Sequence, residues 1–411
     1  MNAENELSII GPDDERYRSD PDKPTGPVGV RSLQELIERA THFAVSTPTT
    51  ADDSGVAEIY AFPFLGIVSQ DDMKLALLLN LINPIIGGVL LIGPRGTAKT
   101  TAARSLLDLL PDTERSLCQY GCLPHDIETG GMDAVCPECA RKYGEGEPIS
   151  QTEHAHLVEL PLNARLEDVV GGIDDRASIH HRLRLKRGIL AQADQNILYV
   201  DEVNLLPDEI VDAILDAAAM GRYTVRRGPM AATYRANFTL VGSMNPEEGN
   251  LRPQILDRFG LRVIVRGLDT PQDRQNAYLR AVSFRNNPLS LINQYRDATE
   301  QLRDEIIFAR KRLSKVSVPE KIFNVGLSLI HDLKIDSLRA EITLFEAARA
   351  HAAADDRDEV TLEDLQRVAP LALRLRKSPY IESYLRERIT EDQTVTEAMQ
   401  AVLANLGKET R

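Results

Sequence analysis

The 411-residue sequence contains no tryptophan, and aromatic residues make up only 5% of it. Proteins that bind single-stranded nucleic acids usually stack the bases on aromatic side chains, so this scarcity argues against that class. Basic residues are also outnumbered, with 48 Lys and Arg against 62 Asp and Glu and a formal net charge of -14. Such a charge gives no general affinity for phosphate backbones or anionic membranes. We therefore expect no nucleic-acid partner.

Long apolar runs are also missing from the sequence. The longest, such as residues 75–79, fall far below the roughly 18 residues that a membrane-spanning helix needs. Residues 1–20 are acidic and polar, unlike a secretory signal or an arginine-rich transit peptide. We therefore expect a cytoplasmic protein without a membrane span. Only four cysteines occur, and in a reducing cytosol a cluster of four is expected to bind a metal rather than form disulfides.

The length of the chain and its apolar pattern predict two folded units after an extension. Residues 1–60 are rich in Asp, Glu, Pro, Ser and Thr, with helical spacing only at 33–43, and we expect most of them to be disordered. In residues 61–268, short apolar strands alternate with helices, which is typical of an α/β domain with a mainly parallel sheet. Residues 269–318 are expected to form a linker and a long helix, and residues 319–411 an all-α second domain.

The individual elements of both domains can be predicted from the spacing of apolar residues. The predicted strands cover residues 89–92, 197–200, 238–242 and 262–265, and a hairpin covers residues 223–234 with its turn near Gly228 and Pro229. The predicted helices cover residues 71–81, 100–110, 288–314, 319–333, 337–354 and 361–376.

A glycine-rich loop follows the first predicted strand and precedes a helix, which is the context that a phosphate-binding loop requires. It comprises Gly93, Pro94, Arg95, Gly96, Thr97, Ala98, Lys99 and Thr100, and Thr101 completes the predicted nucleotide-binding residues. Backbone amides of such a loop and the helix N-terminus cradle the β- and γ-phosphates. Lys99 would add a positive charge, and the Thr100 hydroxyl would complete the Mg²⁺ coordination.

One position of this loop departs from the usual pattern. Ala98 stands where glycine commonly precedes the lysine, and alanine fits there if the residue has helical dihedrals. A glycine-rich turn that binds no nucleotide is the alternative interpretation of the loop.

Two adjacent carboxylates, Asp201 and Glu202, end the second apolar strand. The carboxyl ends of parallel strands form the edge where open α/β sheets bind ligands. Asp201 would hold Mg²⁺ through water, and Glu202 would orient or deprotonate the attacking water. The alternative for either residue alone is an acidic helix cap.

Polar residues also follow the third strand. Asn245 could hydrogen-bond the γ-phosphate or the attacking water, although Asn-Pro is by itself a turn signal. Arg252 and Arg258 come next, and an arginine just before the last strand of such a domain can reach the nucleotide of a neighbouring subunit. The alternative for Arg258 is a surface ion pair with Asp257.

The four cysteines form two closely spaced pairs, Cys118-x₃-Cys122 and Cys136-x₂-Cys139, separated by 13 residues. This spacing predicts a tetrahedral, structural Zn²⁺ site within a cysteine-rich insertion at residues 116–150. Apolar residues are few there, so a metal would replace the missing core. An Fe–S cluster and four reduced thiols are the alternatives, and His125 is a possible substitute ligand. His154, His156, His180 and His181 are expected to be ordinary surface residues.

Three runs, at residues 62–79, 197–206 and 241–260, closely resemble the ATPase subunit of magnesium chelatase, a family of the AAA+ superfamily in its chelatase/MoxR-type clade. The similarity covers about residues 62–380 and implies an AAA+ P-loop domain with a parallel sheet, followed by a separate all-α lid domain. By that resemblance, Lys99 and Thr100 belong to the nucleotide loop, Asp201 and Glu202 form the acidic pair, Asn245 is a sensor residue, Arg258 acts on the adjacent protomer, and Arg339 senses the γ-phosphate from the lid.

The resemblance also implies partners and an activity. The expected assembly is a hexameric ring, with an AAA+ partner subunit that carries an integrin-like domain and a large subunit that holds the porphyrin. ATP hydrolysis would drive insertion of Mg²⁺ into protoporphyrin IX in (bacterio)chlorophyll biosynthesis. The alternative is a MoxR-like or chelatase-like chaperone that serves another metalloprotein, or another tetrapyrrole metal such as cobalt. A nucleotide-binding scaffold without hydrolysis is disfavoured, because every catalytic position is filled.

Overall fold

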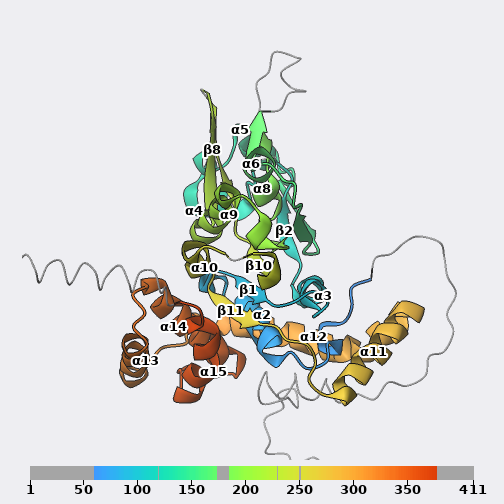
Figure 1. Ribbon diagram of the computed structural model, residues 1–411. Coiled ribbons are helices and arrows are strands. Elements are labelled where there is room, and N and C mark those ends of the chain that lie inside the picture. Colours follow the sequence, from blue (N-terminus) through green and yellow to red (C-terminus); the bar gives the residue numbers. More distant parts are fainter. Residues whose placement is uncertain (1–59, 119, 174–184, 229, 250, 377–411) are drawn as a thin grey trace, which may run out of the picture.

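The computed structural model describes residues 60–118, 120–173, 185–228, 230–249 and 251–376 (Figure 1). The extension up to residue 59, with its predicted helical stretch, lies outside the described residues, as do His180, His181 and the chain after residue 376. Among the helices that the structure describes, none combines the length and apolarity that a bilayer crossing requires.

A five-stranded sheet in the order β11-β1-β10-β7-β4 forms the centre of the molecule. Its strands are β1 (Val89–Ile92), β4 (Leu157–Leu160), β7 (Ile197–Val200), β10 (Thr239–Met244) and β11 (Leu261–Ile264). All four neighbouring pairs are parallel. β1, β7 and β10 are buried along their whole length, which explains why β1 and β7 are almost entirely apolar. The predicted α/β fold with a parallel sheet is confirmed.

The two faces of the sheet bury different apolar clusters, because successive side chains of a strand point in opposite directions. Val89 and Leu91 pack into one cluster with α2 (Asp71–Ile82), α3 (Lys99–Ser105) and the C-terminal helices. Leu90 and Ile92 pack into the other cluster with α9 (Asp208–Met220). The helix expected at residues 100–110 changes into a 3₁₀ turn, Leu106–Leu109, after α3.

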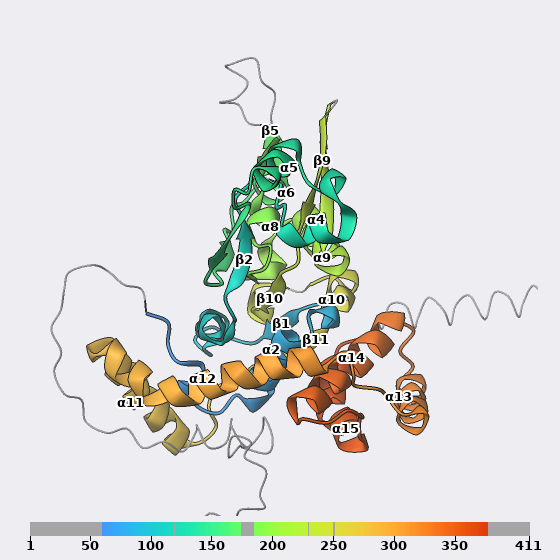
Figure 2. The same ribbon diagram turned by 180° about the vertical axis from the view of Figure 1, so that it is seen from behind.

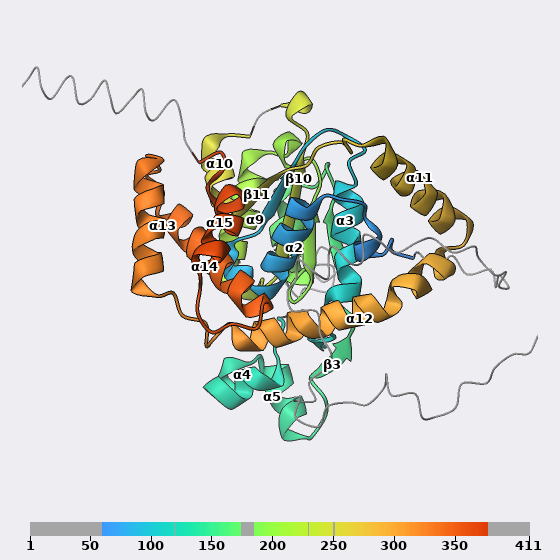
Figure 3. The same ribbon diagram turned by 90° about the horizontal axis from the view of Figure 1, so that it is seen from below.

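Four C-terminal helices follow the predicted spacing: α12 (Pro288–Arg312), α13 (Glu320–Asp332), α14 (Leu338–Ala354) and α15 (Leu362–Leu373). The long helix α12 runs beneath the sheet to the group formed by α13, α14 and α15 (Figures 2 and 3). Small buried alanines along α14 allow close packing against α15 and α12. Beyond β11, the described part of the chain has no further strand, only an isolated bridge between Ser317 and Glu359.

Strand β4 and helix α11 are among the elements that were not predicted from the sequence. Strand β4 lies at the sheet edge and is only partly buried, so its short sequence lacks a clear apolar run. Helix α11 (Pro271–Asn286) has a single buried residue, Arg280, and therefore no apolar stripe that periodicity could detect. Thr270 begins this helix by accepting a hydrogen bond from the Asp273 amide at 3.0 Å.

Three two-stranded ribbons extend from the sheet on the side away from the C-terminal helices (Figure 1). Strands β2 (Thr113–Ser116) and β3 (Ser150–Glu153) flank the insertion that contains α4 (Pro124–Gly130) and α5 (Pro137–Gly144). Strands β5 (Gly171–Ile173) and β6 (Leu185–Arg187) form the second ribbon. The third is β8 (Arg222–Arg227) with β9 (Met230–Arg235), which is the predicted hairpin.

Candidate functional site

The glycine-rich loop joins β1 to α3 at the carboxyl edge of the sheet. Gly93 has no room for a side chain, because an added Cβ would lie 2.1 Å from the Val265 carbonyl oxygen. The helical dihedrals expected for Ala98 are not those observed. Ala98 precedes α3 in the left-handed region, with φ 64° and ψ 21°. This conformation costs an alanine about 1–2 kcal/mol, so the loop holds backbone strain next to Lys99.

The Lys99 side chain turns back over its own loop. Its Nζ donates to the carbonyl oxygens of Gly93 and Pro94, both at 2.7 Å. Partial burial lowers the pKa of Lys99, and the nearby carboxylates of Asp201 and Glu202 oppose this shift. The ammonium group therefore stays inside the loop, at the position where a phosphate-binding loop needs a positive charge.

A chain of hydroxyl groups connects the loop to the acidic strand. The Tyr199 hydroxyl donates to Asp201 Oδ1 at 3.0 Å and lies 2.9 Å from Thr100 Oγ1. Burial raises the pKa of Tyr199 to about 12, so this hydroxyl keeps its proton. Since that proton is directed at Asp201, Thr100 must donate to Tyr199. Ser243 also donates to Asp201 Oδ1 and accepts the Glu202 amide at 3.2 Å.

A second network surrounds Glu202, whose backbone is left-handed with φ 48°. Arg95 Nη2 lies 3.4 Å from Glu202 Oε1 and 2.5 Å from Glu248 Oε1. Asn245 Nδ2 donates to the same Glu248 oxygen at 3.1 Å. Arg95 is 73% exposed, so these ion pairs are weak and can be exchanged for others. The structure thus brings together Arg95, Glu202 and Asn245, which are far apart in sequence.

The residues at this edge suit a nucleotide triphosphate with a divalent cation. The loop supplies backbone amides and Lys99, while Thr100 and Asp201 supply the oxygen ligands that Mg²⁺ prefers. Sequence reasoning missed Tyr199, Ser243 and Glu248. Two of them could have been found, since Tyr199 lies two residues before Asp201 and Ser243 two before Asn245, on the same faces of their strands.

An apolar cavity of about 440 Å³ opens beside the loop at Gly96, Thr97 and Ala98. Its walls come from the segment before α2, from the connection between β11 and α11, and from α11 itself, through side chains that include Phe62, Ile67, Val68, Leu268 and Phe284. A mostly apolar cavity of this size can hold a small flat ring system. These wall residues were not predicted, because their proximity depends on how α11 folds back.

Arg258 and Arg339 lie at the opposite edge of the sheet. Both line a cleft of about 680 Å³ together with Gly87, Asn196 and Thr239, which mark the amino ends of β1, β7 and β10. Arg258 Nη1 pairs with Asp212 and Asp216 of α9 at 3.0 and 2.9 Å. Asp257, the alternative partner considered from sequence, instead bonds Ser337 and Arg376. Neither Arg258 nor Arg339 is therefore directed at the phosphate loop of its own chain.

Comparison with known proteins adds an independent observation. Residues 173–266 match the family described as magnesium chelatase, subunit ChlI, and residues 328–398 match an AAA lid domain. The chain is 42% identical to a magnesium-chelatase subunit ChlI homolog of Methanocaldococcus jannaschii, over 83% of this chain and 92% of the relative. It is 40% identical to the magnesium-chelatase subunit ChlI of Cyanophora paradoxa, over 84% of this chain and 98% of the relative.

The chain belongs to the magnesium-chelatase ChlI family. A solved chain from a complex between subunits BchI and BchD of magnesium chelatase is 37% identical and covers 79% of this chain and 99% of its own, with a TM-score of 0.45. The expected family, and with it the AAA+ ATPase fold with a helical lid, is confirmed by these matches.

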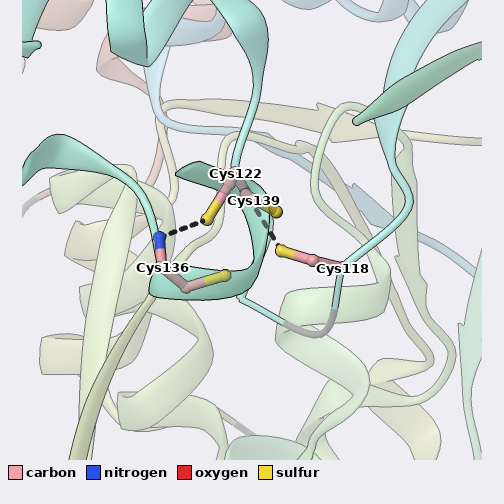
Figure 4. A group of neighbouring side chains, drawn as sticks. All are labelled: Cys118, Cys122, Cys136 and Cys139. Carbon is pink, nitrogen blue, oxygen red and sulfur yellow. Dashed lines mark hydrogen bonds between the residues drawn. The ribbon is translucent and has the colours of Figure 1, made fainter. Parts of the chain in front are cut away.

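This ChlI-family chain also has a second candidate site, in the insertion between β2 and β3. The Sγ atoms of Cys118, Cys122, Cys136 and Cys139 all lie within 4.8 Å of one another (Figure 4). Four thiolates at the usual Zn–S distance of about 2.3 Å would be about 3.8 Å apart, so a small closure completes a tetrahedral site. His125 is not among them; its ring is exposed and lies 3.6 Å from Glu128.

Backbone amides already point at two of these sulfurs. Cys118 Sγ accepts from the amides of Tyr120 and Cys122 at 3.3 and 3.4 Å, and Cys122 Sγ accepts from the Cys136 amide at 3.3 Å (Figure 4). A hydrogen bond from the side-chain thiol of Cys122 lowers the pKa of Cys118 to about 3. Burial raises the pKa of Cys139 to about 12. Four thiolates this close together would repel one another, so a bound cation would be needed to hold them.

The other polar clusters are structural. His351, Asp355 and Asp364 come close together in the lid, but Arg357 pairs with both carboxylates at 3.1 and 2.5 Å. His154 and His156 are exposed, as expected for surface residues.

Proposed function

We propose that this chain is the ATP-hydrolysing motor subunit of a magnesium chelatase, in which hydrolysis drives insertion of Mg²⁺ into protoporphyrin IX for (bacterio)chlorophyll biosynthesis. One observation carries the proposal. The chain belongs to the ChlI family, and Lys99, Asp201 and Glu202 lie at the same edge of its sheet. There, Arg95 pairs with Glu202, and Tyr199 bonds both to Asp201 and to the residue after Lys99.

Bound ATP with Mg²⁺ supplies the phosphoryl group that water attacks. Lys99 and the loop amides would stabilise negative charge on the phosphates, Thr100 would supply an oxygen ligand to the cation, and Asp201 would hold the cation through water. Tyr199 and Ser243 hold Asp201 in place by donating to one oxygen. Glu202 polarises the attacking water, with Asn245 beside it, and the apolar cavity next to Gly96 takes the adenine ring.

We propose a ring of several copies, a hexamer by the resemblance to the family, and the position of the two arginines supports it. Arg258 and Arg339 share a cleft at the amino edge of the sheet, so each can act only on the nucleotide of an adjacent copy. Large apolar side chains border the same cleft, with Ile85, Met220 and Ile342 exposed by 68, 72 and 54%. Burial in a subunit contact would remove this apolar surface from water.

The remaining partners are proposed from the family. They are an AAA+ subunit with an integrin-like domain and a large porphyrin-binding subunit. A reconstitution with both, ATP, Mg²⁺ and protoporphyrin IX tests the proposal. We expect the fluorescence of magnesium protoporphyrin to appear only when ATP and all three proteins are present. ATP hydrolysis without any metallation by Mg²⁺, but with metallation by Co²⁺, would favour the alternative tetrapyrrole metal.

We also propose that the four cysteines of the insertion bind one structural Zn²⁺. Their sulfur separations support this, as does the local core, in which Cys122 and Cys139 are two of the four buried residues. All four ligand positions are thiolates, which leaves none for a substrate.

Elemental analysis of the purified protein should therefore find about one zinc per chain. Cys136→Ser should lose most of the metal, because it removes one of four thiolates, whereas His125→Ala should keep it. Iron with visible absorption would favour an Fe–S cluster instead, and metal-free protein would refute the site.

A further inference from the structure

We propose that the zinc-loaded insertion clamps the β8–β9 and β5–β6 ribbons, so that loss of the metal releases them. This inference rests on the proposed zinc site but not on the proposed chelatase activity. The insertion comprises residues 116–150, and its helix α4 lies beside the β8–β9 hairpin in both views (Figures 1 and 2).

The first contact of the clamp is aromatic. Tyr120 stacks on Tyr234 of β9, with ring centroids 6.3 Å apart and an angle of 12° between the planes. Tyr234 is 1% exposed and also packs on Tyr223 of β8, with centroids 5.6 Å apart. Tyr120 thus extends the small aromatic core that joins the two strands of the hairpin.

The second contact is an ion pair between Arg235 of β9 and Asp126 of α4. The other carboxylate oxygen of Asp126 accepts the Leu123 amide at 2.8 Å, which begins α4. The side chain of Asp126 is only 14% exposed, so solvent screens this pair less than a surface pair. Asp126 therefore links the fold of the insertion directly to the hairpin.

The third contact reaches the other ribbon. Gly121 has a φ of 76°, and an added Cβ would lie 2.9 Å from Nη2 of Arg187 on β6. The left-handed backbone favours glycine at this position, and the end of the Arg187 side chain lies close to it.

The metal matters because it controls the segment that makes these contacts. Tyr120 and Gly121 lie between Cys118 and Cys122, and Asp126 follows four residues after Cys122. Among the described residues of the insertion, the apolar core cluster buries Val135 and Ile149 besides two of the cysteines, and Leu123 is buried outside it. Without a metal, so small a core cannot hold the turn in place. In the sequence, the clamped hairpin connects α9 to β10. Helix α9 forms the ion pair with Arg258, and β10 ends directly before Asn245.

Hydrogen–deuterium exchange of the full chain tests the clamp. Tyr120→Ala should keep about one zinc per chain, while amides of residues 222–235 exchange about two- to tenfold faster, the effect of losing one aromatic pair. Tyr143→Ala is the matched control, because Tyr143 lies in the same insertion with 40% exposure against 38% for Tyr120. It should leave exchange unchanged.

Should Tyr120→Ala fold poorly, Asp126→Asn removes the charge facing Arg235 but keeps an oxygen for the Leu123 amide.

Stripping the metal from the wild-type protein, with a mercurial thiol reagent and a chelator, should produce the same faster exchange. Confirmed metal release with unchanged exchange in the hairpin would overturn the clamp, and protein isolated without metal would overturn its dependence on zinc. No step of this experiment uses ATP or porphyrin, so a failure of the motor proposal would leave its result intact.

Discussion

Glu202→Gln should retain ATP binding and lose hydrolysis by about 10²–10⁴-fold, the usual contribution of a general base. The amide has nearly the same shape as the carboxylate, so the loop and Lys99 still hold the nucleotide. It cannot accept a proton from the attacking water. Steady-state phosphate release and equilibrium binding of a fluorescent ATP analogue measure the two effects separately.

Two further variants give this experiment its controls. Glu209→Gln changes an exposed carboxylate on the nearby helix α9 and should hydrolyse ATP normally. Lys99→Ala should lose nucleotide binding itself, because the loop then lacks its positive charge. Normal hydrolysis by Glu202→Gln would show that the proposed role of this residue is wrong.

Arg258→Ala should lower hydrolysis by about 10³–10⁵-fold, the range measured for arginines that act on a neighbouring nucleotide. The side chain lies at the amino edge of the sheet and is held by Asp212 and Asp216, away from its own phosphate loop. In the proposed ring, each active site would combine Glu202 of one copy with Arg258 of the next.

This arrangement predicts complementation. Arg258→Ala and Glu202→Gln chains should each be inactive alone, yet mixed rings should regain partial activity, because a Glu202→Gln copy can supply Arg258 to an intact site beside it. Mixing Arg258→Ala with the double variant is the control and should restore nothing. Absence of complementation in rings shown to be mixed would mean that Arg258 acts within its own chain or not at all.

The chemistry of the nucleotide site could be predicted because its signals are local. Lys99 and Thr100 are neighbours that begin α3, just after the loop that follows β1, and Asp201 and Glu202 are neighbours that directly follow β7. Parallel strands end at the same edge, so the two pairs had to meet once the sheet formed. The same holds for the cysteines, whose spacing alone grouped them into two close pairs.

Features that depend on packing between distant segments could not be predicted in this way. The left-handed backbone of Ala98 follows from how the loop fits between β1 and α3. It could not be predicted from the residue type, because alanine rarely adopts this conformation. Helix α11 is too polar to show periodicity, yet it supplies Phe284 to the cavity beside the loop. The ion pairs of Arg258 depend on α9, about forty residues earlier in the chain, rather than on the adjacent Asp257.

The sequence by itself determined the fold class, the positions of the phosphate loop and acidic strand, and the four thiols, because these follow from neighbouring residues and the period of each element. Only the tertiary structure decided that Tyr199 and Ser243 hold Asp201, that Arg258 and Arg339 face away from their own loop, and that the insertion contacts both ribbons. Those relations join segments through side-chain contacts across the fold, and contacts of that kind leave no regular spacing in the chain.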